Sequence, residues 1–231
     1  MPAVFLTARW EKLFLLTFAV EPQKLLPYLP KGIDLDMLDN QAFVSFVAFD
    51  FLDTRLKGFH IPFHVNFPEI NLRFYVRKGE KRGVAFIREF VPKFWIAQVA
   101  QTLYNEPYKK IAMTSNWQES AQKIQLEHHF AGFELKVQSD NATFLPKEDS
   151  LEHFFKEHDC GFGTNHQGQT LEYAVEHPFW EVYKNVNYKL NLDFGKLYGK
   201  EWEFLNKAEV FSTVLAKGSP IKVFGAEKVQ V

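Results

Sequence analysis

The segment FPEINLRFYV, residues 67–76, alternates polar and apolar side chains along most of its length. On a β-strand, successive side chains point to opposite faces, so Glu69, Asn71, Arg73 and Tyr75 share one face while apolar residues form the other. The apolar face belongs in a core. The polar face either lies in solvent or lines the interior of a barrel, where buried polar groups must find partners. In an interior, an arginine suits a carboxylate ligand, which it can grip with two hydrogen bonds.

Further strands are predicted on both sides of this segment. Residues 42–52 are almost continuously apolar, which is typical of a strand covered on both faces. The tetrapeptide 78–81 predicts a hairpin loop. The other predicted strands, from apolar runs and alternation, are 13–20, 33–38, 71–77, 83–91, 111–117, 122–130, 133–138 and 169–177, and a closing hairpin is predicted from 210–216 and 221–224.

A few short helices are predicted between the strands, at 21–29, 93–104, 151–155 and 194–205. Asp149 or Ser150 is the expected N-cap of the third. The strands do not alternate regularly with helices, which argues against a parallel doubly wound sheet. We therefore expect a mainly β protein, an antiparallel barrel or sandwich with peripheral helices. Nothing resembles a linker, so residues 1–231 are expected to form a single domain.

Composition restricts the classes of function. The chain of 231 residues holds 25 Phe, and its 27 Lys and Arg nearly balance its 28 Asp and Glu, which argues against nucleic-acid binding. Cys160 is the single cysteine and cannot form an internal disulfide, which suits a reducing compartment. No apolar run is long enough to span a bilayer. A cytoplasmic protein is therefore expected, with no membrane partner. The many Phe residues suit a core, a pocket or a subunit interface, so a homo-oligomer is among the expectations.

The pair Lys109-Lys110 follows Pro107 and Tyr108 between apolar segments. An amine held in an apolar site beside a second amine has a lowered pKa, because burial and like charge both disfavour protonation. A neutral lysine can attack a carbonyl and form a Schiff base. Lysine pairs are also common in solvated turns that carry out no chemistry, and the dipeptide alone does not separate the two interpretations.

Other motifs are weaker. The spacing of His153, His158 and Cys160 matches no common zinc pattern, and no metal site or cofactor is predicted. The Gly-x-Gly at 161–163 does not lie between a strand and a helix, so it does not predict a dinucleotide site. His177 begins a rigid aromatic segment, where it could act as an acid, base or hydrogen-bond donor, or could belong to a packing turn.

At this point the ordered motifs resemble a known family. They are ARW (8–10), LPKGI (29–33), EINLRFYV (69–76), RGV (82–84), EPY (106–108), HPFW (177–180), LYG (197–199) and AKGS (216–219). Together they look like the uncharacterised bacterial DUF2071 or YqjF-like family, over nearly the whole chain. That family is distantly similar to acetoacetate decarboxylase, and the resemblance implies a largely antiparallel β-barrel with a central apolar cavity.

The resemblance also implies a mechanism and site residues. In acetoacetate decarboxylase, a Pro-Lys-Lys motif supplies a Schiff-base lysine and a neighbouring cation that lowers the pKa of that lysine. Aligned on the lysine pair, Lys109 would be the nucleophile here and Lys110 the neighbouring cation. Glu69 resembles a pocket carboxylate, and Arg73 is the candidate for the substrate carboxylate. Aligned instead on the proline, Tyr108 takes the place of the nucleophile, and a phenol cannot form a Schiff base. In a strand, only one of the two lysines could enter the cavity.

Three functional hypotheses remain open at this stage. The first is a lyase-type enzyme (decarboxylase, dehydratase or aldolase) for a small oxo acid or carbonyl compound, with Lys109, Lys110 and Glu69 as catalytic residues. The second is a non-catalytic binding protein for a small carboxylate. In both, the expected substrate-binding residues are Arg73, Tyr75, Tyr108 and His177. The third is a structural protein whose aromatic residues form an interface.

Overall fold

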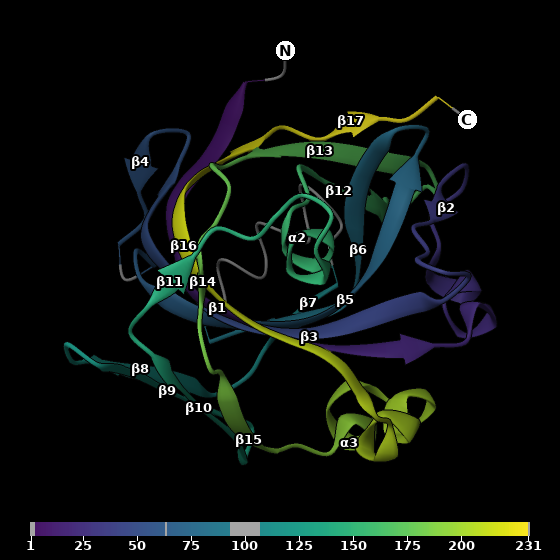
Figure 1. Cartoon of the computed structure of the whole chain (residues 1–231). Coiled ribbons are helices and arrows are strands. Elements are labelled where there is room, and N and C mark those ends of the chain that lie inside the picture. The colour runs from purple at the N-terminus through teal and green to yellow at the C-terminus, as the bar shows by residue number, and fades with distance from the viewer. Residues whose placement is uncertain (1–2, 63, 93–106, 231) are drawn as a thin grey trace.

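The computed structural model describes residues 3–62, 64–92 and 107–230. Within them the chain forms two β-sheets with a few short helices (Figure 1). The strands are β1 (Val4–Val20), β2 (Asp34–Leu35), β3 (Ala42–Leu56), β4 (Phe59–His60), β5 (Phe67–Lys78), β6 (Lys81–Val91), β7 (Tyr108–Lys110), β8 (Met113–Glu119), β9 (Lys123–Phe130), β10 (Phe133–Asp140), β11 (Thr143–Phe144), β12 (Cys160–Thr164), β13 (Thr170–Glu176), β14 (Val182–Tyr183), β15 (Asn187–Asn191), β16 (Val210–Phe224) and β17 (Glu227–Lys228). The helices are α2 (Leu151–Lys156) and α3 (Phe194–Tyr198), with 3-10 turns at η1 (Pro22–Lys24), η2 (Leu26–Tyr28) and η3 (Lys200–Lys207).

The larger sheet has the strand order β11-β14-β16-β1-β3-β5-β6-β12-β13-β17, and β13 also pairs with β16. In Figure 1 its strands curve around α2. The expectation of a mainly β protein is confirmed, and the larger sheet is mixed, with mostly antiparallel pairs and some parallel ones. β6 pairs in parallel with both β7 and β12, because long connections return the chain to the same edge in the same direction.

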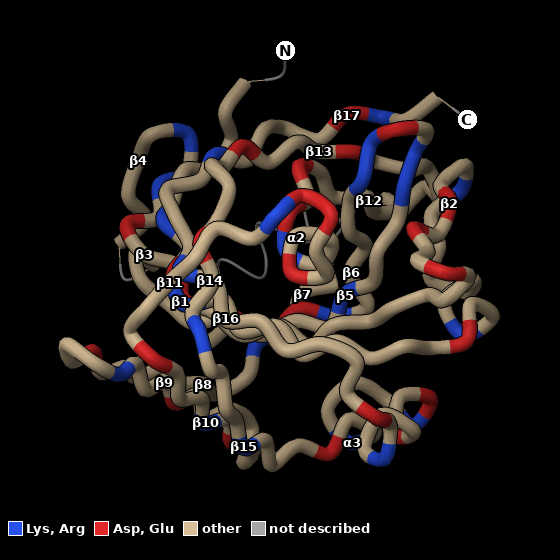
Figure 2. Tube along the Cα trace, in the orientation of Figure 1, with Lys and Arg blue, Asp and Glu red and all other residues tan. Residues whose placement is uncertain are grey.

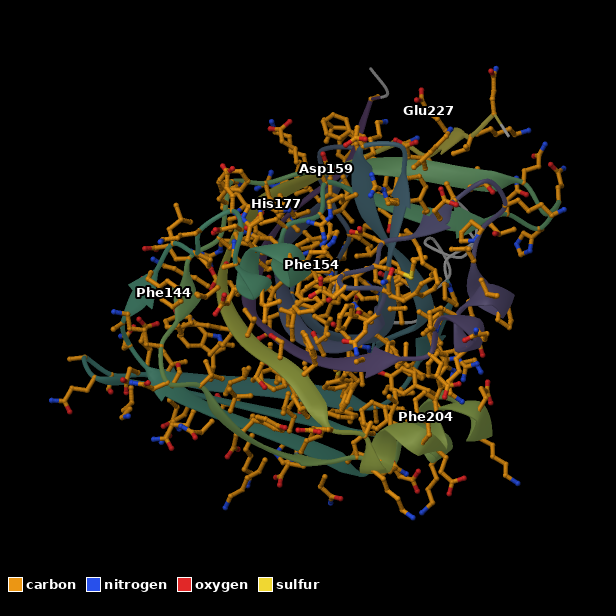
Figure 3. All side chains as sticks on the ribbon, turned by 45° about the vertical axis from the view of Figure 1, so that its right-hand side comes forward. Phe144, Phe154, Asp159, His177, Phe204 and Glu227 are labelled. Atoms are coloured by element: carbon orange, nitrogen blue, oxygen red, sulfur yellow. The ribbon has the colours of Figure 1, made fainter. Side chains whose placement is uncertain are left out.

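The smaller sheet, β15-β10-β9-β8, and α3 pack on one face of the larger sheet (Figure 1). Val44 and Phe46 of β3 join that core, whereas Val47 and Phe49 belong to a second cluster on the opposite face. The predicted strand at 42–52 is therefore covered on both faces, as its nearly continuous apolar character indicated. Side chains fill much of the space between α2 and the surrounding strands (Figure 3).

Several local predictions are confirmed. The loop at 78–81 joins β5 to β6, and Gly79 takes a φ of 60° there, which suits a tight hairpin turn. Ser150 caps α2, because its Oγ accepts a hydrogen bond of 3.2 Å from the backbone N–H of His153. The strand at 133–138 is β10, within a residue or two.

Other local predictions are corrected. The closing hairpin is instead one long strand, β16, which pairs with β1 along most of its length. The predicted helix at 194–205 is interrupted at Gly199, whose φ of 126° ends α3 before η3 begins. The predicted helix at 21–29 forms only the turns η1 and η2. The predicted helix at 93–104 lies outside the described residues.

Charged side chains of both signs are interspersed along the loops and outer strands (Figure 2). Among the described residues, every helix is too short or too polar to cross a lipid bilayer.

Candidate active site

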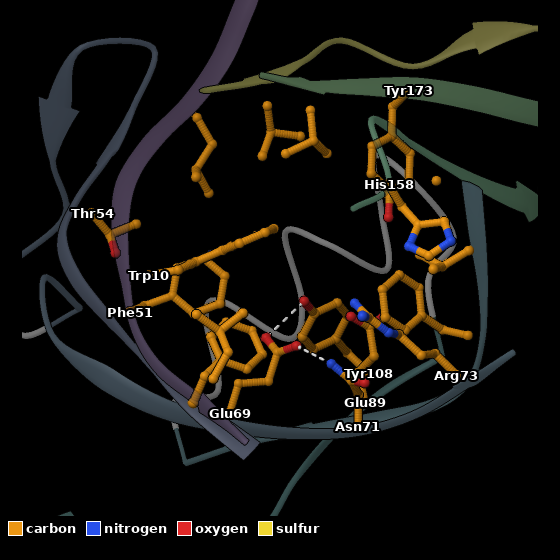
Figure 4. A pocket seen from close by; sticks show the side chains of 18 of the residues that line it. Trp10, Phe51, Thr54, Glu69, Asn71, Arg73, Glu89, Tyr108, His158 and Tyr173 are labelled. Atoms are coloured by element: carbon orange, nitrogen blue, oxygen red, sulfur yellow. Dashed lines mark hydrogen bonds between the residues drawn. The ribbon is translucent and has the colours of Figure 1, made fainter. Parts of the chain in front are cut away.

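A cavity of about 150 Å³ lies on the inner side of the larger sheet. Figure 4 shows polar side chains gathered along one part of its wall and aromatic rings along another. The aromatic part includes Phe5, Trp10, Phe49, Phe51, Phe67 and Trp180, and the polar part includes Glu69, Asn71, Arg73, Glu89, Tyr108 and His158. A small enclosure that combines an apolar wall with a few converging polar groups is the usual form of a ligand site.

Three neighbouring strands bring the polar groups together. Asn71 of β5 lies opposite Glu89 of β6, and Glu89 lies opposite Tyr108 of β7. Glu69 and Arg73 point to the same side of β5 as Asn71, because each is two residues away. Three residues of the polar face, Glu69, Asn71 and Arg73, therefore line a cavity, which decides between the two sequence-based alternatives for that strand.

Glu69 lies at the centre of the cluster and is almost fully buried. One carboxylate oxygen accepts a hydrogen bond of 3.0 Å from Nδ2 of Asn71, and the other accepts one of 3.0 Å from the Tyr108 hydroxyl (Figure 4). Burial raises the pKa of Glu69 to about 7, although these hydrogen bonds and the Arg73 charge oppose the rise. A carboxyl group with this pKa can both accept and give up a proton near neutral pH.

Glu89 and Tyr108 complete an acidic cluster around Glu69. Glu89 is also almost fully buried, and its hydrogen bond to Glu69 is one of the effects that lower the pKa of Glu69. Burial, followed by the negative charges of Glu69 and Glu89, raises the pKa of Tyr108 well above its ordinary value. The Tyr108 phenol therefore stays protonated and acts as a hydrogen-bond donor beside the two carboxyl groups.

Beyond the acidic cluster, the cavity wall carries polar atoms that have no hydrogen-bonding partner in the described part of the chain. They are Nε1 of Trp10, Oγ1 of Thr54, Oδ1 of Asn71, Nε of Arg73, and Nδ1 and Nε2 of His158. An unsatisfied buried polar atom costs about 1–3 kcal/mol, so each of these atoms favours a ligand with complementary polar groups. Donors and acceptors both occur among them, which indicates a ligand that is itself polar at several positions.

His158 and Arg73 approach each other at one end of the cavity. The guanidinium of Arg73 donates a hydrogen bond of 3.3 Å to the Phe155 carbonyl. Burial lowers the pKa of His158 well below its ordinary value, and the positive charges of Arg73 and Arg82 lower it further. A neutral imidazole therefore stands near the cationic guanidinium, and the N–H groups of both can donate hydrogen bonds to an anionic group.

The lysine pair is not part of this cavity. Lys109 and Lys110 are both exposed, and neither belongs to the lining residues. The expectation that one of them enters the cavity is corrected: Tyr108 takes the inward position of the short strand β7, and the two lysines follow at its exposed end. This arrangement corresponds to the alignment on Pro107, in which the tyrosine occupies the place of the nucleophile.

Two predicted substrate-binding residues lie behind the cavity wall. The Tyr75 hydroxyl lies 2.5 Å from Oγ of Ser45 and donates a longer hydrogen bond of 3.4 Å to the Phe155 carbonyl. The His177 ring stacks on Trp180 at a centroid distance of 4.2 Å. Neither Tyr75 nor His177 belongs to the lining residues, so both are placed to support the wall rather than to contact a ligand.

Several lining residues escaped the sequence analysis. Glu89 was not predicted to line the cavity because β6 contains a bulge. Leu72 pairs with Arg88 and Arg73 pairs with Phe86, so Ile87 is an extra residue without a partner in β5. Strict alternation from Phe86 would direct Arg88 inward, and the bulge directs Glu89 inward in its place. A carboxyl group among the mostly apolar residues in the second half of β6 was the available signal.

The glycine pair at 161–163 has a packing role. A Cβ atom on Gly161 would lie 2.2 Å from the ring of Tyr173, a cavity-lining residue. Only glycine therefore allows this ring to lie against the backbone of β12. Among the described residues, no group of three or more His, Cys, Asp or Glu side chains is arranged to hold a metal ion.

The chain matches a known protein family by sequence and several solved structures by fold. Residues 7–220 match the family DUF2071, which is described as an uncharacterized conserved protein. No curated protein matches the chain by sequence. The solved structures with a similar fold include an acetoacetate decarboxylase-like enzyme from Sphingomonas wittichii RW1 (14% identity, TM-score 0.66, 99% of this chain and 94% of that chain).

Two further solved structures share the fold. One is acetoacetate decarboxylase from Legionella pneumophila (13% identity, TM-score 0.65, 99% of this chain and 88% of that chain). The other is the enduracididine biosynthesis enzyme MppR complexed with the condensation product of pyruvate and imidazole 4-carboxaldehyde (8% identity, TM-score 0.66, 99% and 90%). At these identities the likeness concerns the fold alone.

Proposed function

The chain belongs to the DUF2071 family, and from that premise we propose that its cavity is the active site of an enzyme that transfers a proton on a small oxo acid. The observation that carries the proposal is the buried Glu69 carboxyl group, held between Asn71 and Tyr108 on the cavity wall. Such a group has the position and the near-neutral pKa that general acid–base catalysis requires.

The size of the cavity favours a ligand of about six non-hydrogen atoms. An engineered apolar cavity of about 150 Å³ accommodates benzene, and the cavity here has the same volume. Pyruvate and acetoacetate are of this size. A short oxo acid of this size would contact both the aromatic and the polar parts of the wall.

The charges favour a carboxylate at the Arg73 end. Arg73 has an unpartnered Nε–H, and His158 beside it is neutral, so an anion there would be attracted rather than repelled. The carbonyl end of the ligand would then lie toward Glu69, Asn71 and Tyr108. In this orientation the Tyr108 hydroxyl can donate to the carbonyl oxygen while Glu69 removes a proton from the adjacent carbon.

The similar solved structures support this choice of substrate class through what they are reported to bind. MppR has been solved with pyruvate and with a product formed from pyruvate, and two other similar structures are acetoacetate decarboxylase or an enzyme like it. MppR binds pyruvate, acetoacetate decarboxylase is named for a short oxo acid, and their fold is the fold of this chain. The assignment of the same substrate class here rests on the cavity and not on sequence identity.

Deuterium exchange tests the proposal directly. Pyruvate or acetoacetate is incubated with the protein in D₂O, and the loss of the proton signal next to the carbonyl is followed by NMR. We expect the protein to accelerate exchange and Glu69→Gln to lose about two to four orders of magnitude of that acceleration, as is usual for a general base. Glu227→Gln removes an exposed carboxyl group that is not among the cavity-lining residues and serves as the matched control.

A second function, a binding protein for small carboxylates, has one observation in its favour. The lysine pair that the resemblance assigned to Schiff-base chemistry is exposed and outside the cavity, whereas the unpartnered polar atoms of the wall need only a bound ligand. Binding measured by calorimetry without any accelerated exchange would favour this function over catalysis. Accelerated exchange that Glu69→Gln leaves unchanged would contradict the role proposed for Glu69.

A further inference from the structure

A lysine that the sequence analysis did not select lines the cavity. Lys156 is the last residue of α2, and its side chain has no exposed surface. It belongs to the cavity-lining residues together with Arg73 and His158. A fully buried lysine is uncommon, because the ammonium group loses its hydration, and such residues occur where an amine is used chemically or paired with a buried acid.

The helix that carries Lys156 is fixed to β5 and β6 by side chains that bind its backbone carbonyls. Arg82 of β6 donates a hydrogen bond of 3.2 Å to the Phe154 carbonyl, and Arg73 of β5 donates one of 3.3 Å to the Phe155 carbonyl. The Tyr75 hydroxyl donates to the same Phe155 carbonyl. Lys156 directly follows Phe155, whose carbonyl Arg73 binds, and both Lys156 and Arg73 line the cavity.

Glu157 is positioned as the proton acceptor for this amine. Its carboxylate binds the Lys156 ammonium group, accepts a hydrogen bond of 3.0 Å from the backbone N–H of Trp180, and lies 3.7 Å from Nδ1 of His177. These contacts hold the carboxylate in place. Burial lowers the pKa of Lys156, although the Glu157 charge opposes the change. Transfer of a proton from Lys156 to Glu157 would leave a neutral amine inside the cavity.

We propose that Lys156 is the nucleophilic amine of the cavity and forms an imine with the carbonyl carbon of the bound oxo acid, an inference that rests on the function proposed above. The Lys156 nitrogen adds to the carbonyl carbon, and the π electron pair moves to oxygen. The proton lost from nitrogen passes through Glu157 and returns to the hydroxyl group, which leaves as water. Lysine ammonium and ketone therefore give a protonated imine and one water molecule, and no other reactant is needed.

The protonated imine makes it easier for Glu69 to remove a proton from the substrate. It is a stronger electron acceptor than the ketone, so it lowers the barrier to removing a proton, or carbon dioxide, from the adjacent carbon. A carboxylate bound at Arg73 would bring the neighbouring carbonyl carbon of a 2-oxo acid toward Lys156, since both side chains line the same small cavity. The substrate class therefore narrows to oxo acids whose carbonyl lies next to, or one carbon from, the carboxylate.

Reductive trapping tests this inference. The protein is incubated with pyruvate and borohydride, the reduced adduct is measured by intact mass, and the modified lysine is located by peptide mapping. We expect one adduct, on Lys156. Lys156→Arg keeps a cation for Glu157 but cannot form an imine, so the adduct should be lost while pyruvate binding, measured by calorimetry, is retained. Lys196→Met is the matched control, because Lys196 also lies in a short helix beside an acidic residue but is exposed.

The outcomes separate this inference from the proposed function. Pyruvate binding without an adduct on Lys156, or with an adduct on Lys109 or Lys110, would overturn the inference and leave the proposed function standing. Failure of both pyruvate and acetoacetate to bind the folded protein would overturn both. If Lys156→Arg does not give the cooperative thermal unfolding of the parent protein, peptide mapping of the unmodified chain decides the question, because it needs no variant.

Discussion

Two regions of the molecule bury a basic side chain among aromatic and acidic groups, and they differ in how completely those groups are paired. Between the two sheets, the buried Lys12 donates a hydrogen bond of 2.8 Å to the Tyr183 hydroxyl and lies 3.5 Å from a Glu119 carboxylate oxygen. Its ammonium group also stands 4.6 Å from the ring centre of Trp117. Every donor direction of this lysine therefore meets an acceptor, a carboxylate or an aromatic face.

In the cavity, by contrast, Arg73 uses one nitrogen for the Phe155 carbonyl and has no partner in the described structure for Nε. His158 has none for either ring nitrogen. The comparison teaches that burial and charge alone do not identify a ligand site, since both regions have them. Incomplete pairing marks the cavity, because a folded protein normally satisfies its buried polar groups.

The largest effect is expected from Lys12→Ala. The substitution leaves Tyr183 and Glu119 without their shared cation and opens space beside Trp117, so we expect a loss of about 3 kcal/mol in the free energy of unfolding by denaturant. Pyruvate affinity should not change. Lys24→Ala is the control, because exposed Lys24 stacks 4.6 Å from Phe204 and should cost less than about 1 kcal/mol. Equal losses in the two variants would contradict the structural role of Lys12.

Glu69→Gln should change the pH dependence of stability. The folded protein binds the Glu69 proton more tightly than the unfolded chain does, since its pKa rises from 4.5 to about 7. The proton therefore stabilises the fold at pH 5, and this contribution is lost as the pH rises through 7. We expect the free energy of unfolding of the parent protein, relative to Glu69→Gln, to fall by about 2–3 kcal/mol between pH 5 and pH 8. Parallel curves for the two proteins would show that Glu69 has an ordinary pKa.

Arg73→Met should weaken pyruvate binding more than it weakens the fold. A charge-assisted hydrogen-bond pair is worth about 2 kcal/mol, which corresponds to about a 30-fold rise in Kd measured by calorimetry. The protein loses one hydrogen bond of 3.3 Å to the Phe155 carbonyl, so its melting temperature should fall only slightly. Arg77→Met is the matched control: Arg77 lies on the same strand but binds the Gly79 carbonyl outside the cavity. A similar Kd for both variants would remove Arg73 from the ligand site.

The smallest effect is expected from Tyr75→Phe, which tests the placement of Tyr75 behind the wall. Loss of its hydroxyl removes the contacts to Ser45 and to the Phe155 carbonyl and should cost about 1 kcal/mol in the free energy of unfolding. Pyruvate affinity should stay within the error of the calorimetric measurement, whereas Tyr108→Phe should lower it. A clear loss of affinity in Tyr75→Phe would return Tyr75 to the ligand-contacting residues.

Much of this fold follows from local patterns in the sequence. The alternation in residues 67–76 correctly separated the core face of β5 from the face that carries Glu69, Asn71 and Arg73. The nearly continuous apolar run of β3 correctly indicated cover on both faces. Both features depend only on the alternation of side chains between the two faces of a strand, which is a local property of the sequence. The family resemblance predicted a central cavity, and the match over residues 7–220 confirms the family.

Long-range packing decided what the sequence left open. The bulge at Ile87 directs Glu89 rather than Arg88 into the cavity, which makes the cluster acidic, and it arises from how β6 pairs with β5. The end of α2 and the segment after it bring Lys156 and His158 to the wall from about eighty residues beyond β5, and Arg73 and Arg82 bind backbone carbonyls of α2. The sequence by itself therefore determined which strand carries the polar face. Which groups face it was determined only in the tertiary structure, because strand register and backbone contacts between distant segments have no local sequence period.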